Sequence, residues 1–336
     1  PLITFMYYGA IAVLILSILL DNRNPAKTTG YILVLIFLPV IGFFIYLFFG
    51  QDFRKRKLFN LKGYKDNLIV QRWITDHKRL FEATKIKNEK KLGDLIQVSE
   101  ILVGNNGFVE YNNSAKILIN GEEKFRELKS ALQEAQHHIH LEYYIIEDDP
   151  ETQSIFDILI ERASKGIQVR IIYDSVGSKS LPSKLIKRLK QNGIEIFPFM
   201  PVFFPFFTSK ANYRNHRKIA IVDGVTGFVG GINLSQRYSN EANNSVFWRD
   251  THLRVDGAVV KQLQIHFMLM WKFVAEQTLP VQISYFPELP TYGHSPIQIG
   301  VSGPDSDWAY LMMAFFKSIS VASRYVYITT PYFIPN

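Results

Sequence analysis

The chain has 336 residues, a net charge of +8 and no cysteine, and 47% of its residues are hydrophobic. Its length is sufficient for one large or two medium domains with an additional element. The lack of cysteine excludes disulfides, thiolate metal sites and cysteine nucleophiles. The positive charge indicates an anionic partner, either nucleic acid or an anionic membrane, and does not distinguish between them.

Two uncharged apolar segments open the chain, at residues 2–20 and 31–49. As a helix, each would be about 28 Å long, close to the thickness of the hydrocarbon layer of a bilayer. Residues 54–57 are all basic, whereas the connection carries only Arg23 and Lys27, so the rest of the chain is predicted to be cytoplasmic. We therefore predict a two-helix transmembrane hairpin at residues 1–52, with buried core helices as the alternative.

Strands and helices are predicted to alternate from residue 122 onward. A polar helix at 68–81 lies before this region, in a linker to which we assign no chemistry. The periodicity predicts helices around 125–135, 155–163, 184–190 and 258–273, and strands at 140–146, 169–173, 194–197 and 252–255. Such alternation indicates an α/β layered domain.

Three features outside the main motif have ordinary structural explanations. His137, His138 and His140 allow a metal site beside Glu142, but surface or strand-end histidines are the simpler interpretation. Asp174, directly after a strand, is expected to cap a turn, with a functional role as the alternative. The apolar, proline-rich segment 197–207 would either be buried or enter a membrane interface.

The central motif is the segment 215–223, which reads as one strand followed by Gly230-Gly231-Ile232-Asn233. Side chains alternate along a strand, so His216 and Lys218 would share a face. A neutral imidazole can act as a nucleophile or proton carrier, and an ammonium can hold a phosphate oxygen. This pairing favours phosphoryl chemistry without a metal.

A weak internal repeat is also present. Residues 131–144 and 318–332 have a similar apolar pattern, typical of a helix followed by a strand. We therefore predict four regions: the hairpin at 1–52, a linker and basic segment at 53–110, a first α/β domain at 111–290 and the start of a second at 291–336.

The spacing of His216, Lys218 and Asp223, with the Gly-Gly-x-Asn phrase ending at Asn233, resembles the signature of the phospholipase D superfamily. Further phrases resemble one branch, the bacterial cardiolipin synthases; they lie at residues 23–25, 39–42, 248–252, 302–305 and 330–335. The resemblance covers nearly the whole chain. It implies a phospholipase D-like α/β/α domain, complete in its first half and only begun in its second, preceded by the transmembrane hairpin.

The resemblance also implies a mechanism. Two such motifs form one site, and a histidine attacks the phosphorus of phosphatidylglycerol, expels glycerol and passes the phosphatidyl group to a second phosphatidylglycerol, which yields cardiolipin. His216 would be the nucleophile or the acid/base. Lys218, Asn233 and Gly231 would bind the phosphate, Asp250 would accept a hydrogen bond from His216, and Asp223 would be structural. No metal or cofactor is implied.

Two alternatives to a phosphatidyltransferase stay open at this point. One is a phospholipase D-type hydrolase or nuclease, and the other is a non-catalytic membrane protein that binds lipid. The expected partners are anionic phospholipids, phosphatidylglycerol and cardiolipin, and a membrane rather than nucleic acid; a homo-oligomer could pair two single motifs. The expected location is the bacterial cytoplasmic membrane, multi-pass, with the catalytic domain in the cytoplasm. Without the second motif, residues 1–336 alone are expected to be inactive.

Overall fold

The computed structural model describes residues 2–20, 25–49, 68–201, 214–240, 246–303 and 308–332. They divide into two compact units, one containing the described residues up to 49 and the other those from 68 onward. The basic run at 54–57, residues 202–207 of the apolar segment and residues 333–336 lie outside the described ranges.

The N-terminal unit contains three helices, α1 (Leu2–Leu20), α2 (Pro25–Phe37) and α3 (Pro39–Phe49). The prediction of one helix over 31–49 is wrong, because Pro39 lacks an N–H and restricts the residue before it. α3 packs closely on α2, since a Cβ added to Gly42 would lie 2.8 Å from the Leu35 Cα. Within the described ranges, none of the helices has both the length and the apolar character needed to cross a bilayer.

The second unit is built on a mixed sheet of eight strands among the described residues, in the order β4-β3-β2-β5-β6-β7-β1-β8. β2, β3 and β4 run parallel, and the remaining neighbours pair antiparallel. The strands are β1 (Glu110–Ile119), β2 (His138–Tyr143), β3 (Gln168–Asp174), β4 (Glu195–Phe199), β5 (Lys218–Val222), β6 (Thr226–Gly230), β7 (Thr251–Gly257) and β8 (Ser295–Ile297).

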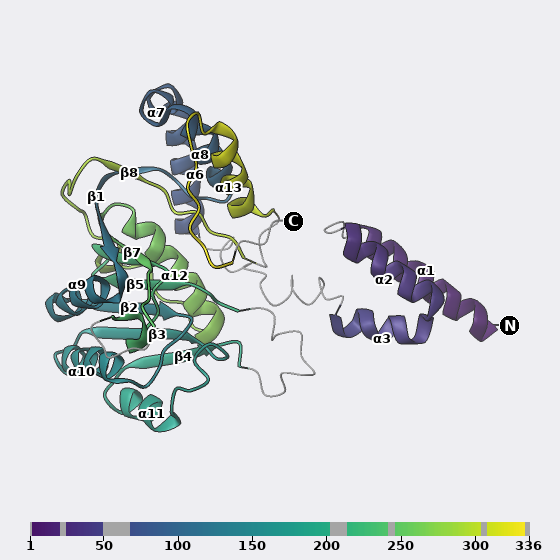
Figure 1. The fold of residues 1–336 in the computed structure, drawn as a ribbon, viewed down its shortest axis with the longest axis horizontal. Helices are drawn as coiled ribbons and strands as arrows, with labels where there is room; N and C mark the ends of the chain where they lie inside the picture. Colours follow the sequence, from purple (N-terminus) through teal and green to yellow (C-terminus); the bar gives the residue numbers. More distant parts are fainter. Residues whose placement is uncertain are drawn as a thin grey trace. The chain divides into compact units, whose positions relative to one another are not determined.

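Helices cover both faces of this sheet (Figure 1). On one face, α9 (Asn120–Glu134), α10 (Pro150–Ser164) and α11 (Ser183–Gln191) bury a core that includes Leu128, Phe156 and Leu189. On the other face lies α12 (Val260–Ala275), which contacts β4, β5, β6 and β7. The predicted α/β layered domain is confirmed.

The remaining elements of this unit lie before β1, around the site and after β7. They are α6 (Leu68–Ala83), α7 (Lys85–Leu92), η1 (Gly93–Leu95), α8 (Ile96–Val103), η4 (Gln236–Tyr238), η5 (Ile283–Tyr285) and α13 (Tyr310–Val321). α13 packs against α8 (Figure 1). The strand predicted after this helix is absent from described residues 322–332, which pair with none of the described strands.

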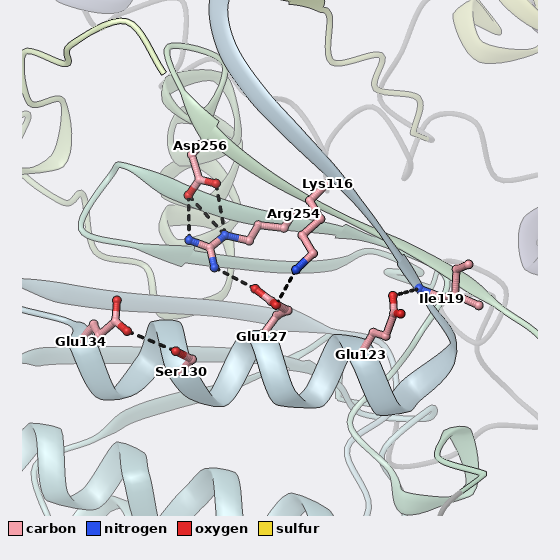
Figure 2. A network of polar contacts seen from close by, with 8 residues as sticks. All are labelled: Lys116, Ile119, Glu123, Glu127, Ser130, Glu134, Arg254 and Asp256. Carbon is pink, nitrogen blue, oxygen red and sulfur yellow. Dashed lines mark hydrogen bonds and ion pairs between the residues drawn. The ribbon is translucent and has the colours of Figure 1, made fainter. Parts of the chain in front are cut away.

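A charged network joins α9 to the neighbouring strands β1 and β7 (Figure 2). The Glu127 carboxylate accepts from Lys116 at 2.7 Å and from Arg254 at 2.9 Å. Arg254 also donates to Asp256, its neighbour but one on β7. The network fixes α9 across two strands, and α9 carries residues that reach the site described below.

Two further expectations differ from the structure. The strand predicted over 215–223 begins only at Lys218, because the Asn215 side chain accepts from the Arg217 N–H and draws the chain out of the ladder. His138 and His140 are fully buried rather than at the surface, although His138 does lie at the start of β2.

Candidate active site

The residues of the His-x-Lys and Gly-Gly-x-Asn motifs meet at one end of the sheet. In the β2–β5 register Tyr143 lies opposite Lys218, so the end of β2 meets the start of β5. β6 ends at Gly230 and β7 begins at Thr251 beside it. Segments far apart in sequence, 143–146, 214–218, 230–234 and 248–252, therefore converge there.

His216 lies just before β5 and is accessible to solvent. Its ring packs on that of Tyr144, with 4.6 Å between centroids. This partial desolvation lowers the pKa of His216, the positive charge of Lys218 lowers it further, and Asp174 acts in the opposite direction. The imidazole is therefore neutral at neutral pH, as a nucleophile or general base requires.

Lys218 is buried, with a relative exposure of 3%. Its ammonium donates to the main-chain oxygen of His216 at 2.7 Å and lies 5.2 Å from the centroid of the Tyr144 ring. Burial lowers the pKa of Lys218 to about 8, while the Asp250 carboxylate raises it. Lys218 is thus a desolvated cation held beside the histidine, and an anion that reached it would be bound strongly.

Asn233 is buried between β2 and η4. Its side-chain oxygen accepts from the Ile145 N–H at 3.0 Å, and its amide nitrogen donates to the Tyr238 hydroxyl at 2.7 Å. A carboxamide has two N–H donors, so the bond to Tyr238 leaves one of them over. These bonds fix the orientation of Asn233 before any ligand arrives.

The Gly230-Gly231 pair leaves room for two side chains of the 250–252 segment. A Cβ at Gly230 would lie 2.7 Å from the His252 Nδ1, and one at Gly231 would lie 2.1 Å from an Asp250 carboxylate oxygen. Neither position tolerates a side chain without movement of these neighbours. The glycines are therefore explained by close approach, not by backbone angle.

Asp250 lies near Lys218 rather than on the ring of His216. Its carboxylate accepts from the Thr251 N–H at 2.7 Å. Its main-chain N–H donates to the Asn120 side-chain oxygen, and its main-chain oxygen accepts from the Asn120 N–H. Within the described residues no hydrogen bond joins Asp250 to His216. The predicted contact between the two is therefore absent from this structure, and the observed effect of Asp250 is on the charge of Lys218.

The segment before β5 is held by two buried carboxylates. Asp174 accepts from the N–H groups of Val176 and Gly177, which is the predicted turn cap, and also from the N–H of Asn215. Glu142 accepts from the Asn215 side chain at 2.7 Å. These contacts place His216 at the site although it precedes the strand.

Asp223 lies at the other end of β5, in a left-handed conformation with φ of 55°. Its carboxylate accepts from three successive N–H groups, those of Gln136, His137 and His138, at 2.8, 2.8 and 2.9 Å. These bonds tie the β5–β6 turn to the start of β2. The geometry supports the structural role predicted for Asp223.

The histidines of β2 have protein partners. His138 and His140 both contact the Gln264 side chain, and the His140 ring stacks on Phe267 with 4.3 Å between centroids. Burial lowers the pKa of His138 to about 4 and that of His140 well below its usual value. Among the described residues, no group of three or more His, Cys, Asp or Glu side chains is arranged to hold a metal ion.

Sequence reasoning missed three residues of this region. Tyr144 contacts both His216 and Lys218, and Lys124 and His252 lie behind Asn233 and the glycine pair. Tyr144 lies within the predicted strand at 140–146, but only the β2–β5 register shows that it lies beside the motif. A lysine on the apolar side of a predicted helix was the available signal for Lys124.

An α/β domain with a His-x-Lys pair at one end of a mixed sheet defines a phospholipase D-like domain. In agreement, residues 128–271 match the family described as "Cardiolipin synthase, PLD-like domain", and residues 9–51 match "Phospholipase_D-nuclease N-terminal".

Curated relatives match almost the entire chain. It is 40% identical to a cardiolipin synthase of Halalkalibacterium halodurans over 99% of this chain and 65% of that protein. It is 34% identical to a cardiolipin synthase of Listeria innocua over 95% of this chain and 67% of that protein. The chain therefore belongs to the cardiolipin synthase family of the phospholipase D superfamily. It spans slightly less than two thirds of the length of the first of these relatives.

Proposed function

We propose that this protein is a membrane-anchored phosphatidyltransferase that condenses two phosphatidylglycerol molecules into cardiolipin and glycerol. The observation that carries the proposal is the pair formed by a neutral, accessible His216 and the desolvated cation Lys218. Family membership supports the same reaction, since the matched relatives are named cardiolipin synthases.

In the proposed mechanism the His216 ring nitrogen attacks the phosphorus of phosphatidylglycerol. The P–O bond to glycerol breaks, and the leaving oxygen takes a proton from a general acid. The hydroxyl of a second phosphatidylglycerol then attacks the phosphatidyl-histidine, gives up its proton to the same group acting as base, and releases His216. His216 in the acid/base role is the alternative assignment.

Charge on the phosphate oxygens is offset by the groups around His216. Lys218 supplies a full positive charge, and Asn233 and the main chain at Gly231 are proposed as hydrogen-bond donors. Asp250 favours the charged form of Lys218 by raising its pKa. Asp223 holds the turn behind the strand.

The membrane location rests on the N-terminal segment. Residues 2–20 are uncharged and apolar, residues 54–57 are basic, and 9–51 match the N-terminal family. We propose a transmembrane hairpin at 1–52, with the domain from residue 111 in the cytoplasm of a bacterium, and we keep the boundaries at 53–110, 111–290 and 291–336 as proposals. Anionic phospholipid is the proposed partner.

The reaction is tested with membranes that carry the full-length protein. They are given phosphatidylglycerol labelled in the unacylated glycerol, and cardiolipin and released glycerol are measured. Equal amounts of the two products are expected, with neither formed by His216→Ala. Phosphatidic acid as the main product would instead indicate a hydrolase, and full activity in His216→Ala would contradict the proposed role of this residue.

A further inference from the structure

Lys124 is a fully buried lysine directly behind the phosphate site. It comes from the first turns of α9 and has no exposed surface. Its Nζ donates to the main-chain oxygen of Asn233 at 3.4 Å and lies 4.2 and 4.9 Å from the ring centroids of Phe125 and Tyr143. One long hydrogen bond and two ring faces are poor compensation for removing an ammonium from water.

The surroundings of Lys124 also lack a carboxylate in contact with it among the described residues. The acidic side chain that raises the pKa of Lys124 is Glu151 on α10, and it is ion-paired with Lys129 at 2.9 Å. Burial therefore holds the pKa of Lys124 well below its usual value, with Glu151 opposing only in part.

Two further buried polar atoms in this region have no hydrogen-bond partner among the described residues, the Tyr143 hydroxyl and the His252 Nε2. The His252 Nδ1 accepts from the Ile232 N–H at 3.3 Å, so in the neutral ring the proton is on Nε2. The pKa of His252 is lowered by burial and then by the charges of Lys124 and Lys218. Both lysines therefore act on the pKa of His252, and Lys124 contacts the main chain of Asn233.

We propose that Lys124 is an unprotonated amine in the free protein and takes up one proton from solvent when a phosphodiester anion binds beside Lys218 and Asn233. The amine becomes an ammonium, and the new charge balances the anion from behind. An anion favours the charged form of a nearby base, so binding and protonation reinforce each other. The proposal rests on the phosphodiester site put forward above, and it makes Lys124 a positioning residue that does not touch substrate.

Other titratable groups around Lys124 are not expected to take up this proton in its place. α10 contributes Glu151, already ion-paired, and β1 contributes Lys116, paired with Glu127. β2 contributes Tyr143 and η4 contributes Tyr238, and burial raises the pKa of both phenols. β7 contributes His252, and burial holds the pKa of this ring well below its usual value.

The first arm of the test measures proton uptake on binding. Full-length protein carrying His216→Ala, which prevents turnover, is titrated calorimetrically at pH 7 with dihexanoylphosphatidylglycerol in two buffers of different ionisation enthalpy. We expect proton uptake that is lost when Lys124→Met or Lys124→Gln is added and kept with Arg126→Met, which removes an exposed basic side chain of the same helix. Gln can still donate to Asn233 but cannot gain charge, so it separates protonation from hydrogen bonding.

The second arm measures stability without ligand. If the pKa of Lys124 is lower in the folded than in the unfolded protein, the unfolded chain binds more protons at any pH between these two pKa values. The contribution of Lys124 to the free energy of unfolding therefore rises with pH until the pKa of the unfolded state is reached. Native protein is then less stable than Lys124→Met at pH 7, and the difference closes towards pH 10. The unfolding midpoint in denaturant measures this for native protein, Lys124→Met and the control Arg126→Met.

The outcomes separate the two proposals. Probe binding with the same proton uptake in all variants, or a stability difference that does not change with pH, would overturn the role of Lys124 alone. A protein that binds no probe would overturn the phosphodiester site, and proton uptake with it, while the stability arm would still show whether the amine is neutral.

Discussion

The two ends of β5 are built in opposite ways. At Asp223 a carboxylate receives three main-chain hydrogen bonds, and its charge is fully used within the protein. At Lys218 an ammonium is desolvated and has one main-chain acceptor, beside an accessible imidazole. The comparison indicates that a charged group with unused hydrogen-bonding capacity, such as Lys218, belongs to the site. A charged group whose hydrogen bonds are all made within the protein, such as Asp223, belongs to the scaffold.

The largest effect is expected from removing the charge at the site end. Lys218→Met should lower the rate of cardiolipin formation by about 10³-fold, as loss of a preorganised charge does in other enzymes. Stability should be unchanged or slightly higher, because a buried cation is replaced by an apolar side chain of similar size. Initial rates and unfolding midpoints are compared with those of Lys187→Met, an exposed lysine on α11. A loss of stability that matches the loss of rate would remove the contrast between the two ends.

Asp223→Ala should produce the reverse pattern. Three N–H groups at the start of β2 lose their acceptor, which should cost about 3 kcal/mol of unfolding free energy. The rate measured well below the melting temperature should change only a few-fold. Chemical denaturation and initial rates at low temperature check this. A variant with native stability and little activity would place Asp223 in the chemistry instead.

The rate should depend on pH in a bell-shaped manner. The rising limb reports loss of a proton from His216, whose pKa lies below its usual 6.5. The falling limb reports loss of a proton from Lys218, whose pKa is about 8. Asp250→Asn removes the carboxylate that raises the pKa of Lys218, so the falling limb should move to lower pH. Rates from pH 5 to 9.5 measure both limbs. A falling limb that stays in place would mean that Asp250 does not act on Lys218.

The sequence alone predicted most helices and the layered class, because these depend on local apolar periodicity. It missed β6, in which two of the five residues are glycines required by close packing against Leu263 and His252. In the site it found His216, Lys218 and Asn233 through a motif with fixed spacing. Tyr144 and Lys124 depend on strand register and on the docking of α9, which connect residues far apart in the chain and are not encoded in local pattern.

The smallest effect is expected from removing a charge in the network between α9 and β7. This change tests whether a charged group with all its hydrogen bonds made within the protein always has a purely structural role. Arg254 binds Glu127 and Asp256, and without it Glu127 keeps Lys116 as a donor (Figure 2). Asp256 keeps the Thr226 hydroxyl as a donor. Arg254→Met should therefore reduce unfolding free energy by about 1 kcal/mol or less, with an unchanged rate. Denaturation at low and high salt measures the loss, which should shrink as salt screens the network. A change in rate without a change in stability would mean that α9 transmits this contact to Lys124 and the site, and that a charged group of this kind can serve function at a distance.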